Sequence, residues 1–444
     1  MCASLRLNEA QVVGTHNSYH QAPPEEIQNL AYNPLVDAVA ASYAQSAVNT
    51  TQYSHLNFYE QLELGLRSLE IDLFPDPTGG IYDQSVLLRL AGTDGWMNNS
   101  ALQPAGFKVL HEPDVDFGSS CFNFSNCLGL IAGWHTANPG HFPLTIFLNQ
   151  KVSGLAEFLG DEGNNLLSAV MQTSSTPGPD TYITVPVFDD ASYDQIEAEV
   201  LQFFNMSEIV TPDEVRGNYS TLSDAVLTNS SGPGWPALDT LWGRLFFVWT
   251  PESFTDYLAL HPNLEGALCF VSSVDGNSGD SGGQTVTDPA GVFIQTFDSL
   301  TWTSPVKASE LRSFTTRAAQ SHKRTLEVVE AGYMTISFTD EDCSEARYNF
   351  TARRDALVSA GAQIIKTDFP TPATFFPSNY TMAPFSSSTG ARCNPVLTHN
   401  STTAAGDAVA IFGGSPVGAP TVVECCAQLW LNHEPPLRCS LLGR

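Results

Sequence analysis

Apolar runs of strand length recur along the chain and alternate with amphipathic stretches of helical period. Eight runs rich in β-branched and aromatic residues are bounded by turn residues, which is typical of buried strands. These predicted strands are 11–18, 66–74, 107–112, 143–151, 244–250, 267–273, 333–338 and 362–369. Apolar residues three and four positions apart predict helices over 57–65, 128–135, 155–172, 308–331 and 341–361.

Alternation of strands and helices favours a parallel sheet covered by helices, and eight strands is the number that closes a (β/α)8 barrel. A bare barrel needs about 250 residues, whereas this chain has 444. We therefore predict an α/β fold, a TIM barrel with long loop insertions. The stretches without a regular pattern, which would supply those insertions, are 75–105, 174–242 and 275–305.

The end of the chain differs in composition from the rest. After Pro370 it is rich in Pro, Ser and Thr and contains four cysteines, Cys393, Cys425, Cys426 and Cys439. A small segment of this kind is commonly held by disulfides. We predict a barrel domain over residues 1–380 and a cysteine-containing extension over residues 381–444 that packs on it.

The chain is strongly acidic, with a formal net charge of −28 at pH 7. This charge argues against nucleic acid as a partner and against tight binding to strongly anionic membranes. Screening over roughly 8 Å at physiological salt still allows a local apolar patch to act. No apolar run reaches about 18 residues, so we expect the protein to meet membranes peripherally, for instance through an exposed Trp96 in the 75–105 loop. We also expect a monomer.

Cysteines and sequons suggest the compartment. Nine N-x-S/T sequons and nine cysteines, with Cys121 and Cys127 bracketing one sequon, favour a secreted glycoprotein with disulfides. The first five residues, Met-Cys-Ala-Ser-Leu, contain no apolar leader. We expect an extracellular protein whose signal peptide is absent from this sequence.

Polar side chains lie at the ends of the first four predicted strands. The motifs are T-H-N-S at 15–18, L-E-I-D at 69–72, L-H-E-P at 110–113 and I-F-L-N-Q-K at 146–151. Because active-site residues of such barrels come from the carboxyl ends of different strands, these side chains are expected to converge. One histidine can accept a proton while another donates one, and carboxylates with amide oxygens suit a hard divalent cation. The sequence therefore predicts metal-assisted attack on a phosphodiester.

Strand alternation decides which side chains share a face. Glu70 and Asp72 point the same way, and they would repel each other unless a cation or base lay between them. The alternative is a solvated acidic edge. Asn149 and Lys151 also share a face.

The remaining candidates carry structural alternatives as well. Lys366 and Asp368 share a face, where a buried structural pair between them is as consistent as a functional role. Arg67, three residues before Glu70, is a candidate partner of the site. His16 with Asn17 could form an ordinary capping pair, and His111 carries a similar structural alternative.

Taken together, these motifs resemble those of the secreted, calcium-dependent phosphoinositide phospholipase C family of bacteria and fungi-like eukaryotes. That family is related to the catalytic barrel of animal phosphoinositide phospholipases. The resemblance covers most of the first 400 residues in the right order. Among the segments that carry it are 14–19, 53–55, 61–72, 111–113, 143–151, 353–356, 361–363, 367–370 and 392–396.

The resemblance implies a site and a reaction. Calcium would be held by Asn17, Glu70, Asp72 and the fourth-strand residue Asn149. The inositol 2-hydroxyl would attack phosphorus, with a metal-bound carboxylate or His16 as base, while His111 protonates the departing diacylglycerol oxygen. The product would be a cyclic inositol phosphate, and the substrate a phospholipid at a membrane surface. Residues expected to bind the substrate are Lys151, Lys366 and Arg67.

Two positions depart from the family pattern. The family usually has glutamate where this chain has Asn149, and calcium affinity is expected to fall with the lost charge. The family usually has an Arg-Thr-Arg-Ala-Asp run where this chain has Ile-Ser-Phe-Thr-Asp at 336–340. Phosphatidylinositol itself, or another phosphodiester, is therefore the expected substrate rather than a highly phosphorylated inositide.

Two other functions stay open at this point. A glycerophosphodiester phosphodiesterase would share the barrel, the Glu-x-Asp pair and two histidines, although Asn17 and the long gap from Asp72 to His111 speak against it. A secreted barrel glycoprotein without catalysis is the other, and Asn149 with the missing arginines motivates it.

Overall fold

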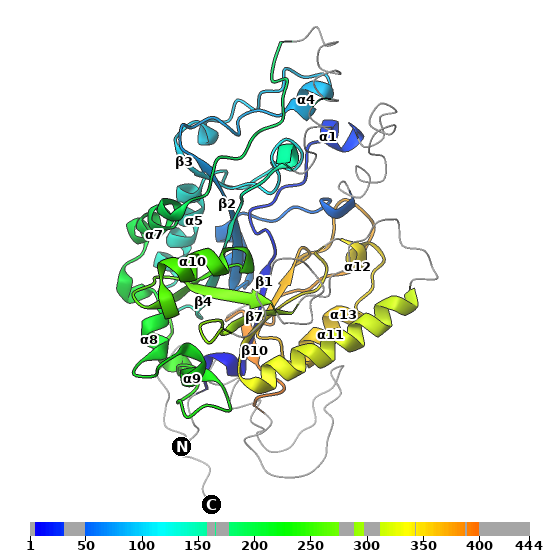
Figure 1. The fold of residues 1–444 in the computed structure, drawn as a ribbon. Coiled ribbons are helices and arrows are strands. Elements are labelled where there is room, and N and C mark those ends of the chain that lie inside the picture. The colour runs from blue at the N-terminus through cyan, green and yellow to red at the C-terminus, as the bar shows by residue number, and fades with distance from the viewer. Residues whose placement is uncertain are drawn as a thin grey trace, which may run out of the picture.

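A closed barrel of parallel strands forms the centre of the computed structural model (Figure 1). The structure describes residues 5–30, 49–157, 165, 177–274, 288–296, 311–341, 343–386 and 389–398. Within them, each barrel strand pairs with the next, and β1 pairs with both β9 and β2, which closes the ring. The eight barrel strands are β1 (Ala10–Thr15), β2 (Ser68–Asp76), β4 (Leu144–Gln150), β5 (Leu245–Trp249), β6 (Phe270–Val274), β7 (Phe293–Thr296), β8 (Met334–Phe338) and β9 (Ile364–Thr367).

The ring closes at a narrow contact between β1 and β2. Gly14 is the residue of β1 that faces Ser68 across the pairing. A Cβ atom on Gly14 would lie 2.5 Å from the Ser68 Cβ and 2.6 Å from the Ser68 carbonyl oxygen, so glycine is required for the two backbones to approach. The first half of β1 instead pairs antiparallel with β10 (Ala391–Cys393).

The predicted number of barrel strands is correct, but one member was wrong and another was missed. The run 107–112 is no barrel strand, because only β3 (Gly106–Lys108) is extended there, and it pairs antiparallel with the end of β2. The missing member is β7, inside the stretch 275–305 that was predicted to be irregular. With four residues, β7 is too short for a clear periodic pattern.

Helices surround the barrel, and several confirm the periodic pattern (Figure 1). The predicted segments 57–65, 128–135 and 308–331 contain α3 (Phe58–Leu64), α5 (Phe124–Ala137) and α11 (Leu311–Ala331). The segment 341–361 is two helices, α12 (Ser344–Arg347) and α13 (Ala352–Ser359), because Asn349 between them has a left-handed φ of 52°. Most of 155–172 lies outside the described residues.

The loops that were predicted to be irregular hold helices of their own. The stretch 174–242 contains α7 (Asp190–Phe203), α8 (Pro212–Arg216) and α9 (Leu222–Val226), of which α7 begins at an Asp189 cap. The stretch 75–105 contains α4 (Val86–Leu90). Two further helices are α1 (Glu25–Leu30) and α10 (Phe254–Leu260). Side-chain caps therefore start helices that hydrophobic periodicity alone did not reveal.

The disulfide between Cys121 and Cys127 is present and ties the preceding loop to the first turn of α5. Among the described residues, no helix is long and apolar enough to cross a bilayer. Residues 399–444, with most of the predicted C-terminal extension, lie outside the described part, so that extension stays a prediction.

Candidate active site

Most of the predicted site residues gather at the carboxyl ends of the barrel strands. His16 directly follows β1, Glu70 and Asp72 lie in β2, Asn149 lies in β4 and Lys366 lies in β9. The parallel register of β2 and β4 places Asp72 directly beside Asn149. The spacing within the motifs and the pairing between strands thus act together to bring these side chains into one site.

His16 is held by a carboxylate from the end of the last barrel strand. Its Nδ1 lies 3.0 Å from Oδ1 of Asp368, which is fully buried. The Asp368 backbone N–H in turn donates to Oδ1 of Asp340 at 2.6 Å, which fixes the loop after β9. Burial disfavours the imidazolium, but Asp368 and then Glu70 outweigh it and raise the pKa of His16 to about 9.

His111 reaches the site from a turn and not from a barrel strand. The backbones of Glu112 and Asp116 hydrogen-bond each other in both directions at 2.9 Å, which folds the turn back on itself. Nδ1 of His111 then lies 2.7 Å from Oδ2 of Asp116, and Nε2 of His20 lies 2.8 Å from Oδ1 of the same carboxylate. His20 is fully buried and stacks on Tyr53 at 4.0 Å between ring centroids.

The orienting contacts of Asp116, His20 and Asp368 were not predicted from the sequence. Asp116 and His20 each lie within a few residues of a predicted catalytic histidine, and that proximity was the available signal. The ligand atoms of His20, His111 and Asp116 all lie within 4.8 Å of one another. Their contacts of 2.7 and 2.8 Å are hydrogen bonds, which account for the cluster without a metal.

Lys366 and Asp368 do not pair with each other. Nζ of Lys366 lies 3.1 Å from Oε2 of Glu70, and its ammonium lies 3.8 Å from the ring centroid of Phe147. Asp368 pairs with His16 instead. The interpretation of a Lys366–Asp368 structural pair was therefore wrong, because Glu70 projects into the barrel at the level of Lys366.

Asp72 meets a positive or hydrogen-bond-donating group at each of its carboxylate oxygens. Lys151 Nζ lies 2.9 Å from Oδ2, and the Asn149 amide nitrogen donates to Oδ1 at 3.0 Å. Thr250 fixes the other side of that amide by donating its hydroxyl to Asn149 Oδ1 at 2.9 Å. Burial would raise the pKa of Asp72, but Lys151, and then His111, lower it, so the carboxylate stays charged.

Asn17 lies in the same group, in the turn after β1. Its φ of 43° is left-handed, a conformation that asparagine tolerates better than most residues. Its backbone N–H donates to Oε2 of Glu70 at 3.4 Å, and its side-chain oxygen accepts from the Tyr19 hydroxyl at 3.3 Å. Its amide nitrogen donates to the Tyr53 hydroxyl at 3.3 Å.

Arg67 lies apart from this group, so its expected role in the site was wrong. Arg67 precedes β2 and thus lies at the opposite, amino end of the barrel. Its Nη1 donates to the carbonyl oxygens of Leu62 and Leu66 at 2.9 and 2.8 Å, and its guanidinium lies over the Trp134 ring. These contacts secure the connection between α3 and β2, which is a structural role.

The four residues expected to hold calcium do not fit that ion as they are arranged. Calcium takes six to eight oxygen ligands, and its affinity follows the charge of the site. Here the two carboxylates, Glu70 and Asp72, are each paired with a lysine at 3.1 and 2.9 Å, so the pairs cancel in charge. Asn149 turns its amide nitrogen, not its oxygen, toward Asp72.

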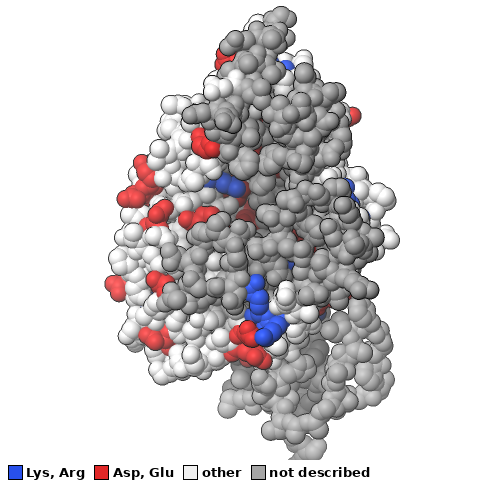
Figure 2. All heavy atoms as spheres, turned by 45° about the vertical axis from the view of Figure 1, so that its right-hand side comes forward, with Lys and Arg blue, Asp and Glu red and all other residues white. Residues whose placement is uncertain are grey.

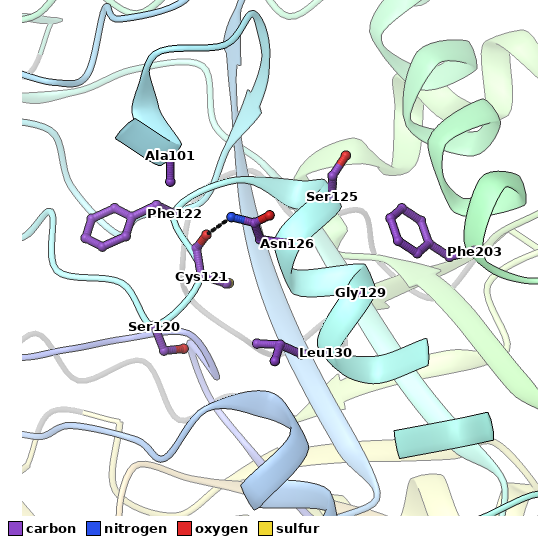
Figure 3. A pocket seen from close by; sticks show the side chains of 9 residues that line it. All are labelled: Ala101, Ser120, Cys121, Phe122, Ser125, Asn126, Gly129, Leu130 and Phe203. Atoms are coloured by element: carbon purple, nitrogen blue, oxygen red, sulfur yellow. Dashed lines mark hydrogen bonds between the residues drawn. The ribbon is translucent and has the colours of Figure 1, made fainter. Parts of the chain in front are cut away.

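A pocket of about 650 Å³ is lined by none of the carboxylates and histidines described above (Figure 3). Figure 3 shows side chains of the 120–122 turn on one side and of α5 on the other, with Phe203 of α7 beyond. Its lining residues are Ala101, Ser120, Cys121, Phe122, Ser125, Asn126, Gly129, Leu130 and Phe203. None of them titrates near neutral pH in this disulfide-bonded state, so the pocket offers no acid–base chemistry.

Among solved structures, two bacterial phospholipases are similar to this chain at low identity. A calcium-dependent phosphoinositol-specific phospholipase C from Pseudomonas sp. is 13% identical, with a TM-score of 0.45, over 84% of this chain and 94% of that one. A Ca²⁺-dependent phosphatidylinositol-specific phospholipase C from Streptomyces antibioticus is 16% identical, with a TM-score of 0.45, over 84% and 98%. No curated protein sequence matches the chain.

A family model gives a direct match over most of the sequence. The model for Ca²⁺-dependent phosphoinositide phospholipase C matches residues 5–300 and 306–395. This span contains every described barrel strand, the His16–Asp368 and His111–Asp116 pairs, and the pairs of Lys151 with Asp72 and of Lys366 with Glu70. The chain belongs to the Ca²⁺-dependent phosphoinositide phospholipase C family.

Proposed function

We propose that this protein is a phosphodiesterase of phospholipase C type that cleaves phosphatidylinositol, or a related phosphodiester, to diacylglycerol and a cyclic inositol phosphate. One observation carries the proposal: two histidines, His16 and His111, each have Nδ1 on a buried carboxylate at the carboxyl end of the barrel. Glu70 also raises the pKa of His16, and His111 lowers the pKa of Asp72, so each histidine interacts electrostatically with one carboxylate of β2. Two oriented imidazoles suit a reaction that needs one base and one acid.

In the proposed reaction, the inositol 2-hydroxyl oxygen forms the new bond to phosphorus and gives its proton to Nε2 of His16. The bond from phosphorus to the glycerol oxygen breaks, and Nε2 of His111 supplies the proton to that oxygen. Asp368 and Asp116 hold the Nδ1 atoms, so Nε2 is the nitrogen left for the substrate. The pKa of about 9 means that His16 acts as base only after losing its own proton.

The positive charge for the phosphoryl oxygens would come from side chains of the chain itself. Lys151 is the more accessible candidate, because 23% of its side chain is exposed, whereas Lys366 is fully buried. Lys366 would act at longer range by holding Glu70.

We also propose that the protein is secreted and glycosylated. The Cys121–Cys127 disulfide supports an oxidising compartment. Six sequon asparagines are exposed, which leaves them accessible to a glycan: Asn98, Asn205, Asn218, Asn229, Asn349 and Asn379. Protein from its native source is expected to shift to lower apparent mass after peptide-N-glycosidase treatment, and an unchanged mass would count against glycosylation.

The test of the activity uses the purified full chain and phosphatidylinositol vesicles, with cyclic inositol phosphate as the measured product. We expect product from the wild type and a loss of at least about 100-fold in kcat for His16→Ala and for His111→Ala. His261→Ala is the control, since His261 packs on Tyr257 of α10. Equal rates for all three variants would remove the proposed catalytic roles, and absence of product from the wild type would overturn the proposed substrate.

A further inference from the structure

The two carboxylates at the mouth of the barrel are paired with cations that belong to the chain. Glu70 pairs with Lys366 and Asp72 with Lys151, at 3.1 and 2.9 Å. The family is described as Ca²⁺-dependent, yet this arrangement leaves no surplus negative charge on the two pairs for a divalent cation. The structure therefore departs from the family description at the very residues that the metal would need.

Lys151 owes its position to the strand register. It directly follows β4, and its backbone N–H donates to the Leu73 carbonyl at 3.1 Å, so the β2–β4 pairing continues past the last strand residue. Its ammonium is thereby brought to Asp72. Asp72 is fully buried, whereas Lys151 is 23% exposed, so the lysine is the solvent-facing member of the pair.

Asn149 supports the same arrangement. Its amide nitrogen donates to Asp72, and Thr250 donates to its oxygen, so the amide is held from both sides. A glutamate at this position would place a third carboxylate beside Asp72 and Glu70. Asparagine removes that charge and supplies a donor to the oxygen of Asp72 that Lys151 does not occupy.

We propose that Lys151 takes the place of the metal ion in this chain, so that cleavage of the phosphodiester is independent of calcium. This inference rests on the proposed function. The ammonium has three N–H donors, and Asp72 engages it on one side. A non-bridging phosphoryl oxygen accepts a second N–H. The charge that builds on this oxygen during attack is then stabilised by a fixed ammonium instead of a bound ion.

Calcium binding is the first test, because it needs no activity. Isothermal titration of the wild-type chain with CaCl2 is expected to show no site tighter than millimolar, and Asn149→Glu/Lys151→Ser is expected to bind at least ten-fold more tightly. Lys108→Met is the matched control, since Lys108 pairs with Asp76 at 2.9 Å farther along β2. A micromolar calcium site in the wild type would overturn the inference.

The second test separates this inference from the proposed function. Product from phosphatidylinositol vesicles is measured in EGTA and in millimolar CaCl2. Activity in EGTA, lost at least 100-fold in Lys151→Met, largely retained in Lys151→Arg and not rescued by calcium, supports the inference. Activity in calcium alone overturns the inference and leaves the function intact.

A wild-type chain that is inactive in both buffers overturns the proposed function. The calcium titration then still decides whether Lys151 replaces the ion. Circular dichroism of Lys151→Met shows whether the variant is folded. If it is not, the wild-type titration and the EGTA assay of the wild type decide the question without it.

Discussion

Both candidate catalytic histidines use Nδ1 for a carboxylate, and in the proposed reaction Nε2 faces the substrate. His16 relies on Asp368 and His111 on Asp116, yet the two pairs differ in surroundings. Asp116 is shared with the buried His20, and burial, which would raise the pKa of Asp116, is outweighed by His20 and His111, which lower it to about 2. Asp116 is therefore charged throughout the neutral range and able to orient His111 in either protonation state.

Asp368→Asn is expected to move the pH dependence of the reaction. In the wild type Asp368 raises the pKa of His16 to about 9, so a basic role for His16 requires the rate to rise as pH approaches 9. Without the carboxylate the pKa of His16 falls, and the rising limb of kcat/KM moves down by about one pH unit or more. The plateau also falls, because the ring loses its orientation. Superimposable limbs in the two proteins would contradict this assignment.

Asp116→Asn is expected to reduce kcat by about 100-fold with little change in KM, since it disorients the acid without removing a substrate contact. Asp114→Asn is the matched control. Asp114 is buried in the same turn, but its carboxylate accepts backbone N–H groups of Val86 and Ile183. That variant is expected to lose stability while its folded fraction keeps the wild-type kcat. Equal kcat losses in both variants would point to a general effect of the turn.

The barrel could be predicted because most of its strands are buried on both faces. Such strands form continuous apolar runs, as Leu245–Trp249 does, and they stand out from polar loops. β7 could not be found in this way, since four residues after a Gly/Ser-rich stretch carry little pattern. The run after Gly106 has the composition of a strand, but it pairs with the end of β2 outside the ring.

The candidate site was predictable where strand periodicity governs it and unpredictable where loops do. Alternation placed Glu70 and Asp72 on one face, and the structure has both at the mouth. Lys366 pairs with Glu70 and His16 pairs with Asp368, and both pairings depend on the register between strands that are far apart in sequence. Asp116 depends on a turn that has no period.

Gly14→Ala tests the narrow contact at which the barrel closes. The new methyl group would meet Ser68, 2.5 Å from its Cβ, so either the β1–β2 pairing or the strand must shift. We expect a loss of about 1–3 kcal/mol in unfolding free energy, measured by urea denaturation.

Gly133→Ala is the matched control for the same added methyl group. Gly133 lies in α5, where the nearest atom to a new Cβ is Tyr59 Cδ2 at 4.0 Å. In the middle of a helix, replacing glycine by alanine is expected to raise the unfolding free energy by about 0.5–1 kcal/mol. A loss of unfolding free energy for Gly14→Ala with a gain for Gly133→Ala would assign the loss to the contact between β1 and β2. An unchanged unfolding free energy for Gly14→Ala would refute the narrow contact.

The acidic surface of the protein and the negative charge of the expected lipid substrate repel each other. Acidic side chains are scattered over the described left part of the face in Figure 2, with few basic ones between them. Phosphatidylinositol is itself anionic, so long-range attraction does not bring the protein to the bilayer. We therefore expect contact through apolar side chains at the carboxyl end of the barrel; β3 and α4 lie beyond the barrel strands in the upper part of Figure 1.

Trp96→Ala is expected to weaken binding to phosphatidylinositol-containing vesicles several-fold in a flotation assay. Trp96 follows α4 and is 46% exposed, and indole rings favour the membrane interface. Leu201→Ala, at 44% exposure on α7, is the control and is expected to bind like the wild type. Added salt is expected to strengthen binding by screening repulsion. Flotation that is equal for Trp96→Ala and the wild type would exclude this contact.

The pairing of β10 with β1 can form only late in the synthesis of the protein. Residues 10–12 leave the ribosome early, but their antiparallel partner is residues 391–393, and Asn394 donates its backbone N–H to Glu9. Until that partner emerges, the outer edge of the first strand offers unpaired backbone groups to other nascent chains. A premature stop shortly before residue 391 would therefore release a chain with every described barrel strand and an open edge, prone to self-association.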